Sequence, residues 1–280
     1  MKFTKYHALG NDYIVVDPQY LDREITDSDI KVLCDRHYGI GADGVLYGPL
    51  KSLKSDFLLR IFNPDASEAE KSGNGLRIFS RYLWDCGLVE DSAFTIETKG
   101  GDVVATIHDS GTQVSVDMGK VRFTHEQDVS PEVTPEVTPE KMHINDRSFE
   151  FYRASVGNPH CVIPVEEVSP SLAKKYGQVI EKDRRFKYRT NVQFMKVIDR
   201  NTIKIEIWER GAGYTLASGS SSTASAAVAN ALGLCDSDIS VQMPGGVIEI
   251  TLKDQWYATM KGPVCKIGDG NIANEALVTF

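Results

Sequence analysis

Long apolar runs are absent from this chain. No stretch approaches the roughly 18 apolar residues that a membrane-spanning helix needs. Residues 1–7 lead directly into patterned sequence, without the apolar core of a signal peptide. We therefore expect neither a membrane span nor a membrane partner, and a cytoplasmic location.

Paired cysteines are also absent. The chain has five cysteines, an odd number, and none of them forms a C-x-x-C pair. This spacing excludes the common zinc-finger and thioredoxin-like patterns and provides no disulfide framework. We expect reduced, mostly buried thiols and no metal site, because free cysteine is among the most buried residue types. The five are Cys34, Cys86, Cys161, Cys235 and Cys265.

Basic residues are outnumbered, with 31 Lys and Arg against 39 Asp and Glu and a net charge of -8. Surfaces that bind nucleic acid or anionic membranes are usually basic, so a nucleic-acid partner is not expected. The length of 280 residues favours about two domains, and 41% hydrophobic residues are enough to fill two ordinary cores.

What the chain does contain is one internal repeat, at an offset of about 146 residues. Five pairs of segments align in the same order, which indicates two related domains with one site between them. The aligned pairs are 7–11 with 154–158, 61–63 with 207–209, 72–74 with 218–220, 100–101 with 245–246, and 118–121 with 260–264.

Alternating apolar positions predict mainly strands in both copies. Two helical segments interrupt them, 75–85 and 222–232, each ending near a glycine, Gly87 or Gly233. The predicted class is α+β, with two pseudo-symmetric lobes, each a mostly antiparallel sheet curled around one central helix. The predicted strands are 13–17, 57–62, 94–98, 103–107, 161–165, 203–208, 239–243 and 247–252.

A Ser-Gly pair stands at the start of each predicted helix, Ser72-Gly73 and Ser218-Gly219. A helix start offers unpaired N–H groups and the positive end of the dipole, so it can hold an anion such as a carboxylate. The alternative is that both serines are ordinary N-caps, a position that serine favours. Their equivalent places in the repeat favour a shared ligand site.

Seven motifs in order, spanning nearly the whole chain, resemble those of the diaminopimelate epimerases, cofactor-independent racemases of the proline-racemase type. They are 9–13 (LGNDY), 39–44 (GIGADG), 63–70 (NPDASEAE), 72–77 (SGNGLR), 157–160 (GNPH), 189–192 (RTNV) and 209–219 (ERGAGYTLASG). The resemblance implies interconversion of L,L- and meso-diaminopimelate, a step toward lysine and cell-wall precursors. It implies no cofactor, and it leaves a homodimer open.

The resemblance also implies two catalytic cysteines at the interface of two lobes, one removing the Cα proton and the other returning a proton to the opposite face. Both positions hold serine here, Ser72 and Ser218. A thiol has a pKa of about 8.5, which a helix start lowers further, whereas a serine hydroxyl is far less acidic. Serine needs a neighbouring base, for which His160 is the nearest candidate; the alternative for His160 is a positioning role. We therefore expect impaired activity.

The substrate-holding set implied by the resemblance is retained. Arg210 would bind the carboxylate and Glu209 the ammonium of the non-reacting amino-acid head, although a surface ion pair is the alternative for these two. Backbone amides at the two helix starts would hold the reacting carboxylate. Any of the asparagines could instead serve a turn or a cap. The full set is Asn11, Asn63, Gly73, Asn74, Asn158, Asn191, Glu209, Arg210, Gly219 and Ser220. Gly44 stands where some relatives carry a glutamine.

Repeat and resemblance together predict an N-terminal lobe of 1–118 plus 266–280, the tail returning to the first sheet, and a C-terminal lobe of 119–265. The segment 130–140 repeats P-E-V-T and is predicted to be an extended, exposed insertion. Three alternatives to an impaired epimerase stay open: an engineered Cys-to-Ser pair that traps substrate, a racemase of another amino acid, and an amino-acid-binding homologue without turnover.

Overall fold

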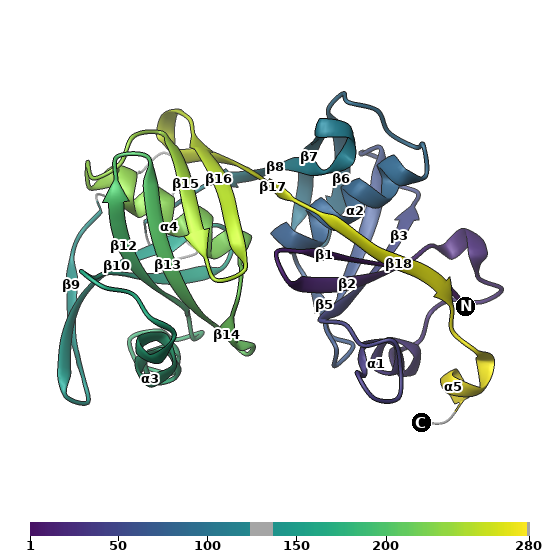
Figure 1. The fold of residues 1–280 in the computed structure, drawn as a ribbon, viewed down its shortest axis with the longest axis horizontal. Coiled ribbons are helices and arrows are strands. Elements are labelled where there is room, and N and C mark those ends of the chain that lie inside the picture. Colours follow the sequence, from purple (N-terminus) through teal and green to yellow (C-terminus); the bar gives the residue numbers. More distant parts are fainter. Residues whose placement is uncertain (124–136, 279–280) are drawn as a thin grey trace. The chain divides into compact units, whose positions relative to one another are not determined.

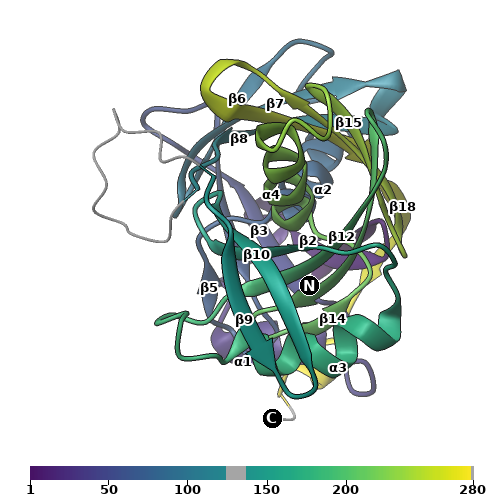
Figure 2. The ribbon, with the colours of Figure 1, turned by 90° about the vertical axis from the view of Figure 1, so that its left-hand side faces the viewer.

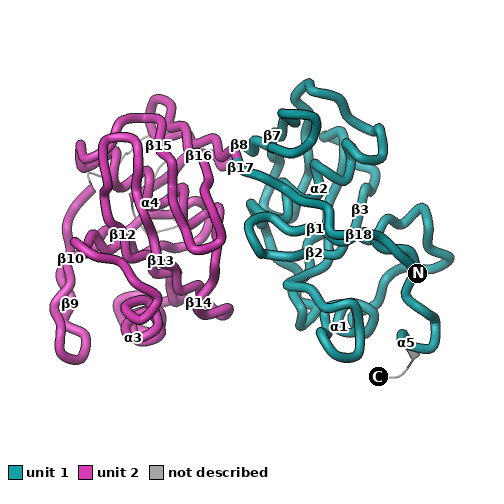
Figure 3. Tube along the Cα trace, viewed as in Figure 1, with its two compact units in different colours: residues 1–117, 262–280 teal, residues 118–261 magenta. Residues whose placement is uncertain are grey.

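In a computed structural model, which describes residues 1–123 and 137–278, the chain folds into two compact units (Figures 1 and 3). The first comprises Met1–Asp117 and Gly262–Phe280, and the second comprises Met118–Lys261. From the sequence we placed the boundaries at 118/119 and 265/266. Both crossings fall inside strands, so the sequence carries no loop signal for them.

Over its described residues, the first unit is a mixed sheet with three helices. Its strands are β1 (Lys2–Ala8), β2 (Asn11–Val16), β3 (Gly44–Leu50), β4 (Phe57–Phe62), β5 (Glu68–Ala69), β6 (Phe94–Thr98), β7 (Gly101–His108), β8 (Gln113–Lys120) and β18 (Cys265–Asn271). Its helices are α1 (Asp27–Cys34), α2 (Gly73–Asp85) and α5 (Asn274–Val278), with short 3₁₀ turns η1 (Pro18–Tyr20) and η2 (Asp109–Gly111).

The second unit is built in the same way. Its strands are β9 (Glu140–Ile144), β10 (Arg147–Ser155), β11 (Pro159–Pro164), β12 (Asn191–Asp199), β13 (Thr202–Glu209), β14 (Gly213–Thr215), β15 (Asp238–Met243), β16 (Gly246–Leu252) and β17 (Tyr257–Pro263). Its helices are α3 (Pro170–Glu181) and α4 (Gly219–Ala231), with the 3₁₀ turn η3 (Asp254–Trp256).

Strand pairing repeats between the units, which confirms the α+β class and matches the internal repeat. In the first unit β1 and β2 pair antiparallel, β2 and β3 parallel, β3 and β4 antiparallel, and β4 and β6 parallel. In the second unit the pairs β10/β11, β11/β12, β12/β13 and β13/β15 have the same directions in the same order. The tail strand β18 pairs antiparallel with β1 in the first unit.

Each sheet is covered on both faces at its centre. Strands β2, β3 and β11 are almost continuously buried, as is the first half of β12, which is typical of strands between two covering layers. Strands β6 and β16 alternate between buried and accessible residues, as strands with one open face do. Figure 2 shows α4 enclosed by the strands of its unit, with α3 on their other side.

The central helices are buried on nearly all sides because their residues permit it. In α4 small residues allow close approach, and Ala224, Ala226 and Ala229 have no exposed surface. In α2 burial extends beyond the predicted stripe of Leu76, Phe79 and Leu83 to residues all around the helix. Both helices end as predicted, with a glycine at positive φ, 68° at Gly87 and 70° at Gly233.

A second helix in each unit was not predicted. Helix α1 packs Ile30 and Leu33 on the sheet face opposite α2, and α3 packs Tyr176 and Ile180 in the same way in the second unit. The expectation of one helix per lobe was therefore incomplete. Thr26 gave a start signal for α1, because its side chain forms a capping box with Asp29.

Two further predictions concern the burial of the cysteines and the P-E-V-T segment. Three cysteines are buried, whereas Cys86 and Cys265 are exposed. Of the P-E-V-T segment, residues 130–136 lie outside the described part of the chain, and Glu140 begins β9. Among the described residues, no helix combines the length and apolarity that crossing a membrane requires.

Gly177→Ala should destabilise the second unit. A Cβ at residue 177 of α3 would lie 2.5 Å from Cβ and 2.7 Å from Cγ of Trp208. The Trp208 indole is held in place, because its Nε1–H donates to Glu181 Oε2 at 2.9 Å. We expect the overpacking cost, about 1–3 kcal/mol, to exceed the gain of roughly 1 kcal/mol in helix propensity.

The measurement is urea unfolding followed by circular dichroism. Gly268→Ala is the matched control, since a Cβ there would meet no atom within 4 Å. Equal stability of the two variants would contradict the packing argument.

Candidate functional site

Ser72 is the N-cap of α2, which is the alternative role that the sequence suggested for this serine. Its backbone is extended (φ −137°, ψ 115°), and its Oγ accepts the backbone N–H of Gly75 at 3.0 Å. The side chain is partly buried. Capping uses only one acceptor position of the hydroxyl oxygen, so the group keeps capacity for a further partner.

Two asparagines of the first unit, Asn74 and Asn11, form one chain of amides beside Ser72. Arg77 donates to Asn74 Oδ1 at 2.7 Å, and Asn74 Nδ2 donates to Asn11 Oδ1 at 3.0 Å. Asn11 Nδ2 then donates to Asp43 Oδ2 at 2.9 Å. A cation at one end and a carboxylate at the other therefore determine the orientation of both amides.

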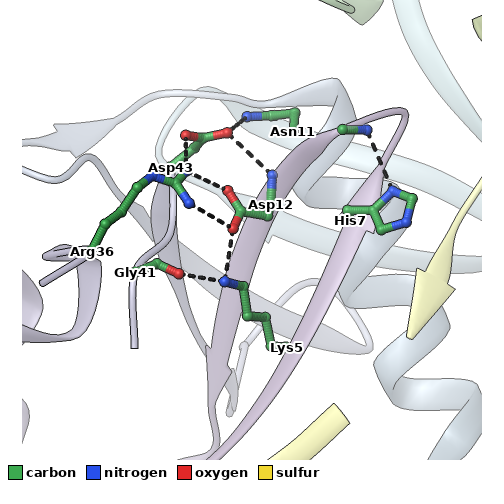
Figure 4. A network of polar contacts seen from close by, with 8 residues as sticks. Lys5, His7, Asn11, Asp12, Arg36, Gly41 and Asp43 are labelled. Atoms are coloured by element: carbon green, nitrogen blue, oxygen red, sulfur yellow. Dashed lines mark hydrogen bonds and ion pairs between the residues drawn. The ribbon is translucent and has the colours of Figure 1, made fainter. Parts of the chain in front are cut away.

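Ionic contacts hold the hairpin that carries Asn11 (Figure 4). Lys5 Nζ lies 2.9 Å from Asp12 Oδ2, and one Arg36 nitrogen bridges Asp12 and Asp43 at 2.9 and 2.8 Å. Burial alone would raise the pKa of Asp12, but the hydrogen bonds from Arg36 and Lys5 outweigh it, so the pKa lies below the ordinary 3.8. Arg77, which connects to Asp43 through the amides of Asn74 and Asn11, is fully buried, and desolvation lowers the pKa of its guanidinium to about 9.

Asn63 lies in a tight turn. Its Nδ2 donates to Ser67 Oγ at 2.9 Å, and its backbone N–H donates to the carbonyl of Ser67 at 2.9 Å. Ala66 within this turn has a φ of 69°. The turn role considered for this asparagine is present, and the residue remains exposed.

Ser218 is the N-cap of α4 and repeats the geometry of Ser72. Its Oγ accepts from the backbone N–H of Ser221 at 3.3 Å and lies 3.5 Å from Ser220 Oγ. Ser218 is only 4% exposed. Both Ser-Gly pairs are therefore at helix starts, Gly73 and Gly219 being the first residues of α2 and α4.

Asn158 and His160 lie beside the start of α4. Asn158 Nδ2 donates to Ser220 Oγ at 3.4 Å, so its oxygen accepts from Nε2 of the buried His160 at 2.9 Å. In this contact His160 positions Asn158, which is the alternative role that the sequence suggested for His160. The pair Asn158 and Ser220 occupies the repeat position of Asn11 and Asn74.

The Glu209-Arg210 segment is held by two buried side chains. Asn191 Oδ1 accepts the Arg210 backbone N–H at 2.9 Å, while its Nδ2 donates to the carbonyl of Pro159 at 3.0 Å. Glu181 Oε1 accepts the Gly211 N–H at 2.9 Å. The sequence analysis did not single out Glu181. It is an acidic residue in a segment where no helix was predicted, so no pattern marked it as functional.

Arg210 itself is exposed, and one of its terminal nitrogens donates to the carbonyl of Tyr188 at 3.0 Å. Its backbone is thus fixed while the guanidinium stays accessible. Planar guanidinium groups bind carboxylates through two parallel hydrogen bonds. The second unit therefore has an accessible guanidinium at Arg210 in addition to the start of a helix.

Tyr13 is a second residue that sequence reasoning missed. Its hydroxyl lies 3.2 Å from Ser72 Oγ, and the residue is 8% exposed. The signal was the repeat, since Tyr13 follows Asn11 by the same spacing as His160 follows Asn158. In both units an ionisable ring therefore follows the asparagine beside the helix start.

Comparison with known proteins identifies the family. The diaminopimelate epimerase family model matches residues 3–124 and 152–267. The chain belongs to the diaminopimelate epimerase family. It is 56% identical over 275 residues to diaminopimelate epimerase 2 of Nostoc sp. (strain PCC 7120), covering 98% of this chain and 96% of the relative. It is 34% identical to the diaminopimelate epimerase of Synechococcus elongatus over 275 residues, 97% of this chain and 98% of the relative.

Solved structures agree on the fold. A probable proline racemase from Agrobacterium radiobacter gives a TM-score of 0.70 at 16% identity, covering 98% of this chain and 93% of that one. A hydroxyproline epimerase from Agrobacterium vitis gives 0.68 at 16% identity, covering 97% and 90%. The chain thus has the fold of this racemase and this epimerase, as expected from the sequence.

Asp12→Asn should weaken the fold and flatten its response to acid. A carboxylate whose pKa is lowered by folding contributes stability above its unfolded pKa of about 3.9, and that stability is lost as pH falls through the folded value. The parent should lose unfolding free energy below about pH 4, and the variant should lose less. Removing a hydrogen-bonded charge here should cost roughly 1.5–3 kcal/mol at pH 7.

Urea unfolding between pH 3 and 7 checks this, with the exposed Asp22→Asn as control. A variant as stable as the parent at pH 7, with an identical acid limb, would contradict the role given to Asp12.

Proposed function

We propose that this protein interconverts L,L- and meso-diaminopimelate by moving the proton of one Cα carbon, with Ser72 and Ser218 in the two base positions. The observation that supports this most strongly is the pair of equivalent N-cap serines at the starts of α2 and α4 in a chain of the diaminopimelate epimerase family. The proposal requires both half-sites to contact the same substrate molecule.

The reaction has three requirements, and groups in each unit suit them. The carboxylate next to the reacting carbon must be held and its carbanion stabilised, which the N–H groups of a helix start do without a metal. A base must take the proton and an acid must return one. The second amino-acid head must be recognised, which we assign to Asn11, Asn63, Asn158, Asn191, Glu209 and Arg210, with amides of Gly73, Asn74, Gly219 and Ser220 on the reacting carboxylate.

The charged side chains of Arg210 and Glu209 favour diaminopimelate, which has a second amino-acid head, over a simpler amino acid. Arg210 is exposed and its backbone is anchored, and Glu209 lies beside it on the same strand end. A substrate without a second head would leave both side chains without a ligand. Cytoplasmic synthesis of lysine and cell-wall precursors is the corresponding biological setting, and a homodimer stays an expectation from the resemblance.

Introducing thiols at both serine positions should raise activity. A serine hydroxyl is a poor acid and base near neutral pH, so the parent should epimerise slowly. Ser72→Cys combined with Ser218→Cys should raise the rate by about 10²–10⁴-fold, the usual contribution of a matched acid–base pair. On a logarithmic scale, each single change should give far less than half of this rate increase, because the two groups act on one carbon as a unit.

The measurement is α-deuterium incorporation and inversion from L,L-diaminopimelate in heavy water, followed by NMR for the parent, both singles and the double. Inversion by the parent at the rate of the double variant would show that hydroxyls suffice. Binding without α-proton exchange in the double variant would instead indicate an amino-acid-binding protein.

Arg210→Lys should weaken binding while leaving the fold intact. An ammonium cannot reproduce the two parallel hydrogen bonds of a guanidinium to a carboxylate, so we expect affinity to fall about tenfold or more. Diaminopimelate should raise the melting temperature of the parent by mass action, and the shift should shrink in the variant. Arg184→Lys is the control, since Arg184 is exposed and lies outside the assigned ligand set. Equal shifts in parent and Arg210→Lys would remove Arg210 from the ligand set.

A further inference from the structure

Tyr13 adds an acidic group to one of the two serines. Its phenol oxygen lies 3.2 Å from Ser72 Oγ, in a pair where either atom can donate. A tyrosine hydroxyl has an ordinary pKa of about 10, far below that of an aliphatic hydroxyl. The contact therefore joins the poorly acidic candidate base to a side chain that gives up its proton much more readily.

Gly44 makes this contact sterically feasible. Strands β2 and β3 run parallel with Tyr13 opposite Gly44. A Cβ at residue 44 would lie 2.6 Å from Cε1 of the Tyr13 ring and 2.6 Å from the carbonyl oxygen of Phe62. Any side chain at 44 would thus occupy the space of the ring, so glycine at this position permits the ring orientation that reaches Ser72.

The hydrogen bonds at Ser72 permit proton transfer from Tyr13 through Ser72. A serine oxygen can accept twice and donate once. One acceptor position takes the Gly75 N–H at 3.0 Å, and the phenol can fill the other. With both filled, the single hydroxyl proton of Ser72 remains for a third partner, the position that the substrate carbon takes in the proposed function.

We propose that Tyr13 is a proton-relay residue for Ser72. As the Ser72 hydroxyl gives its proton to the substrate carbanion, the O–H bond of Ser72 breaks and a Cα–H bond forms. In the same step Tyr13 passes its proton to Ser72 Oγ, and its own O–H bond breaks. The negative charge that left the carbon then resides on a phenolate instead of a serine alkoxide. The reverse sequence removes an α-proton from substrate.

The relay belongs to the Ser72 side. At the equivalent place in the second unit, His160 stands opposite Asn191 and donates Nε2–H to Asn158 at 2.9 Å. That contact fixes an amide and delivers no proton to Ser218. The inference therefore distinguishes the two serines, although their capping geometry is the same.

The experiment rests on the proposed function and uses the full-length chain. Inversion of L,L-diaminopimelate in heavy water is measured for Ser218→Cys, in which one base position holds a thiol and Ser72 is retained, with and without Tyr13→Phe. The same pair is measured in the Ser72→Cys plus Ser218→Cys background. Tyr6→Phe is the matched control, because Tyr6 is the cross-strand neighbour of Tyr13 and its hydroxyl donates to Asp85 at 2.8 Å.

With Ser72 present, Tyr13→Phe should lower kcat about a hundredfold with little change in KM, since general acid–base transfer is lost. With a thiol at 72, the same change should cost about threefold at most, because a thiol needs no relay. Tyr6→Phe should lower the melting temperature without lowering kcat in either background.

Equal losses from Tyr13→Phe in both backgrounds would show a structural role and overturn the relay, as would no loss in either. Absence of inversion in Ser218→Cys would also overturn it, because Ser72 with its phenol would then be incompetent. If the two-thiol variant inverts in that case, the proposed function survives; if neither inverts, the proposed function fails as well.

Discussion

Burial of one helix inside each sheet is the constraint on which the rest of the structure depends. Helices α2 and α4 are enclosed on nearly all sides, so the N–H groups at their starts cannot all be satisfied by bulk water. A serine hydroxyl satisfies one of them in each unit, through Gly75 or Ser221. The same starts carry the positive end of the helix dipole, which suits an anionic ligand.

The two units share a topology and differ in the chemistry placed on it. Tyr13 opposite Gly44 corresponds in register to His160 opposite Asn191. Two residues further along β3, Leu46 lies beside Gly75 of α2. At the equivalent position of β12, Gln193 donates to Ser221 Oγ of α4 at 2.9 Å. The two equivalent helix starts therefore differ in their neighbours: a tyrosine hydroxyl contacts Ser72 at the start of α2, and the amide of Gln193 contacts Ser221 at the start of α4.

Charged side chains next to the candidate site orient neutral ones. Arg77 and Asp43 determine the direction of the amides of Asn74 and Asn11 from opposite ends. Glu181 does the same for the backbone after Arg210. Hydrogen bonds of this kind, with an ionised partner, are shorter and stronger than neutral ones and keep ligand-binding groups in one geometry. Positioning therefore extends well beyond the residues that we assign to the ligand.

Local pattern determined much of this protein. Alternating apolar residues located strands such as Phe57–Phe62 and Phe94–Thr98, which the structure places at the predicted residues. Glycines after a helical pattern located the ends of α2 and α4. The repeat indicated two related units, and the Ser-Gly pairs were located at helix starts, because capping preference depends on residues a few positions apart. Helix α1 was not predicted, although Thr26 and Asp29 form a capping box at its start.

Only the tertiary structure placed Tyr13 against Ser72, or Glu181 against the loop after Arg210. Tyr13 and Ser72 are far apart in sequence, and a tyrosine on an apolar strand has the pattern of a core residue. Their contact depends on parallel pairing of β2 with β3, on a glycine at 44 and on the depth at which α2 is buried. Such contacts join separate elements, so no local preference of the chain specifies them, whereas strands, turns and helix caps arise from neighbours in sequence.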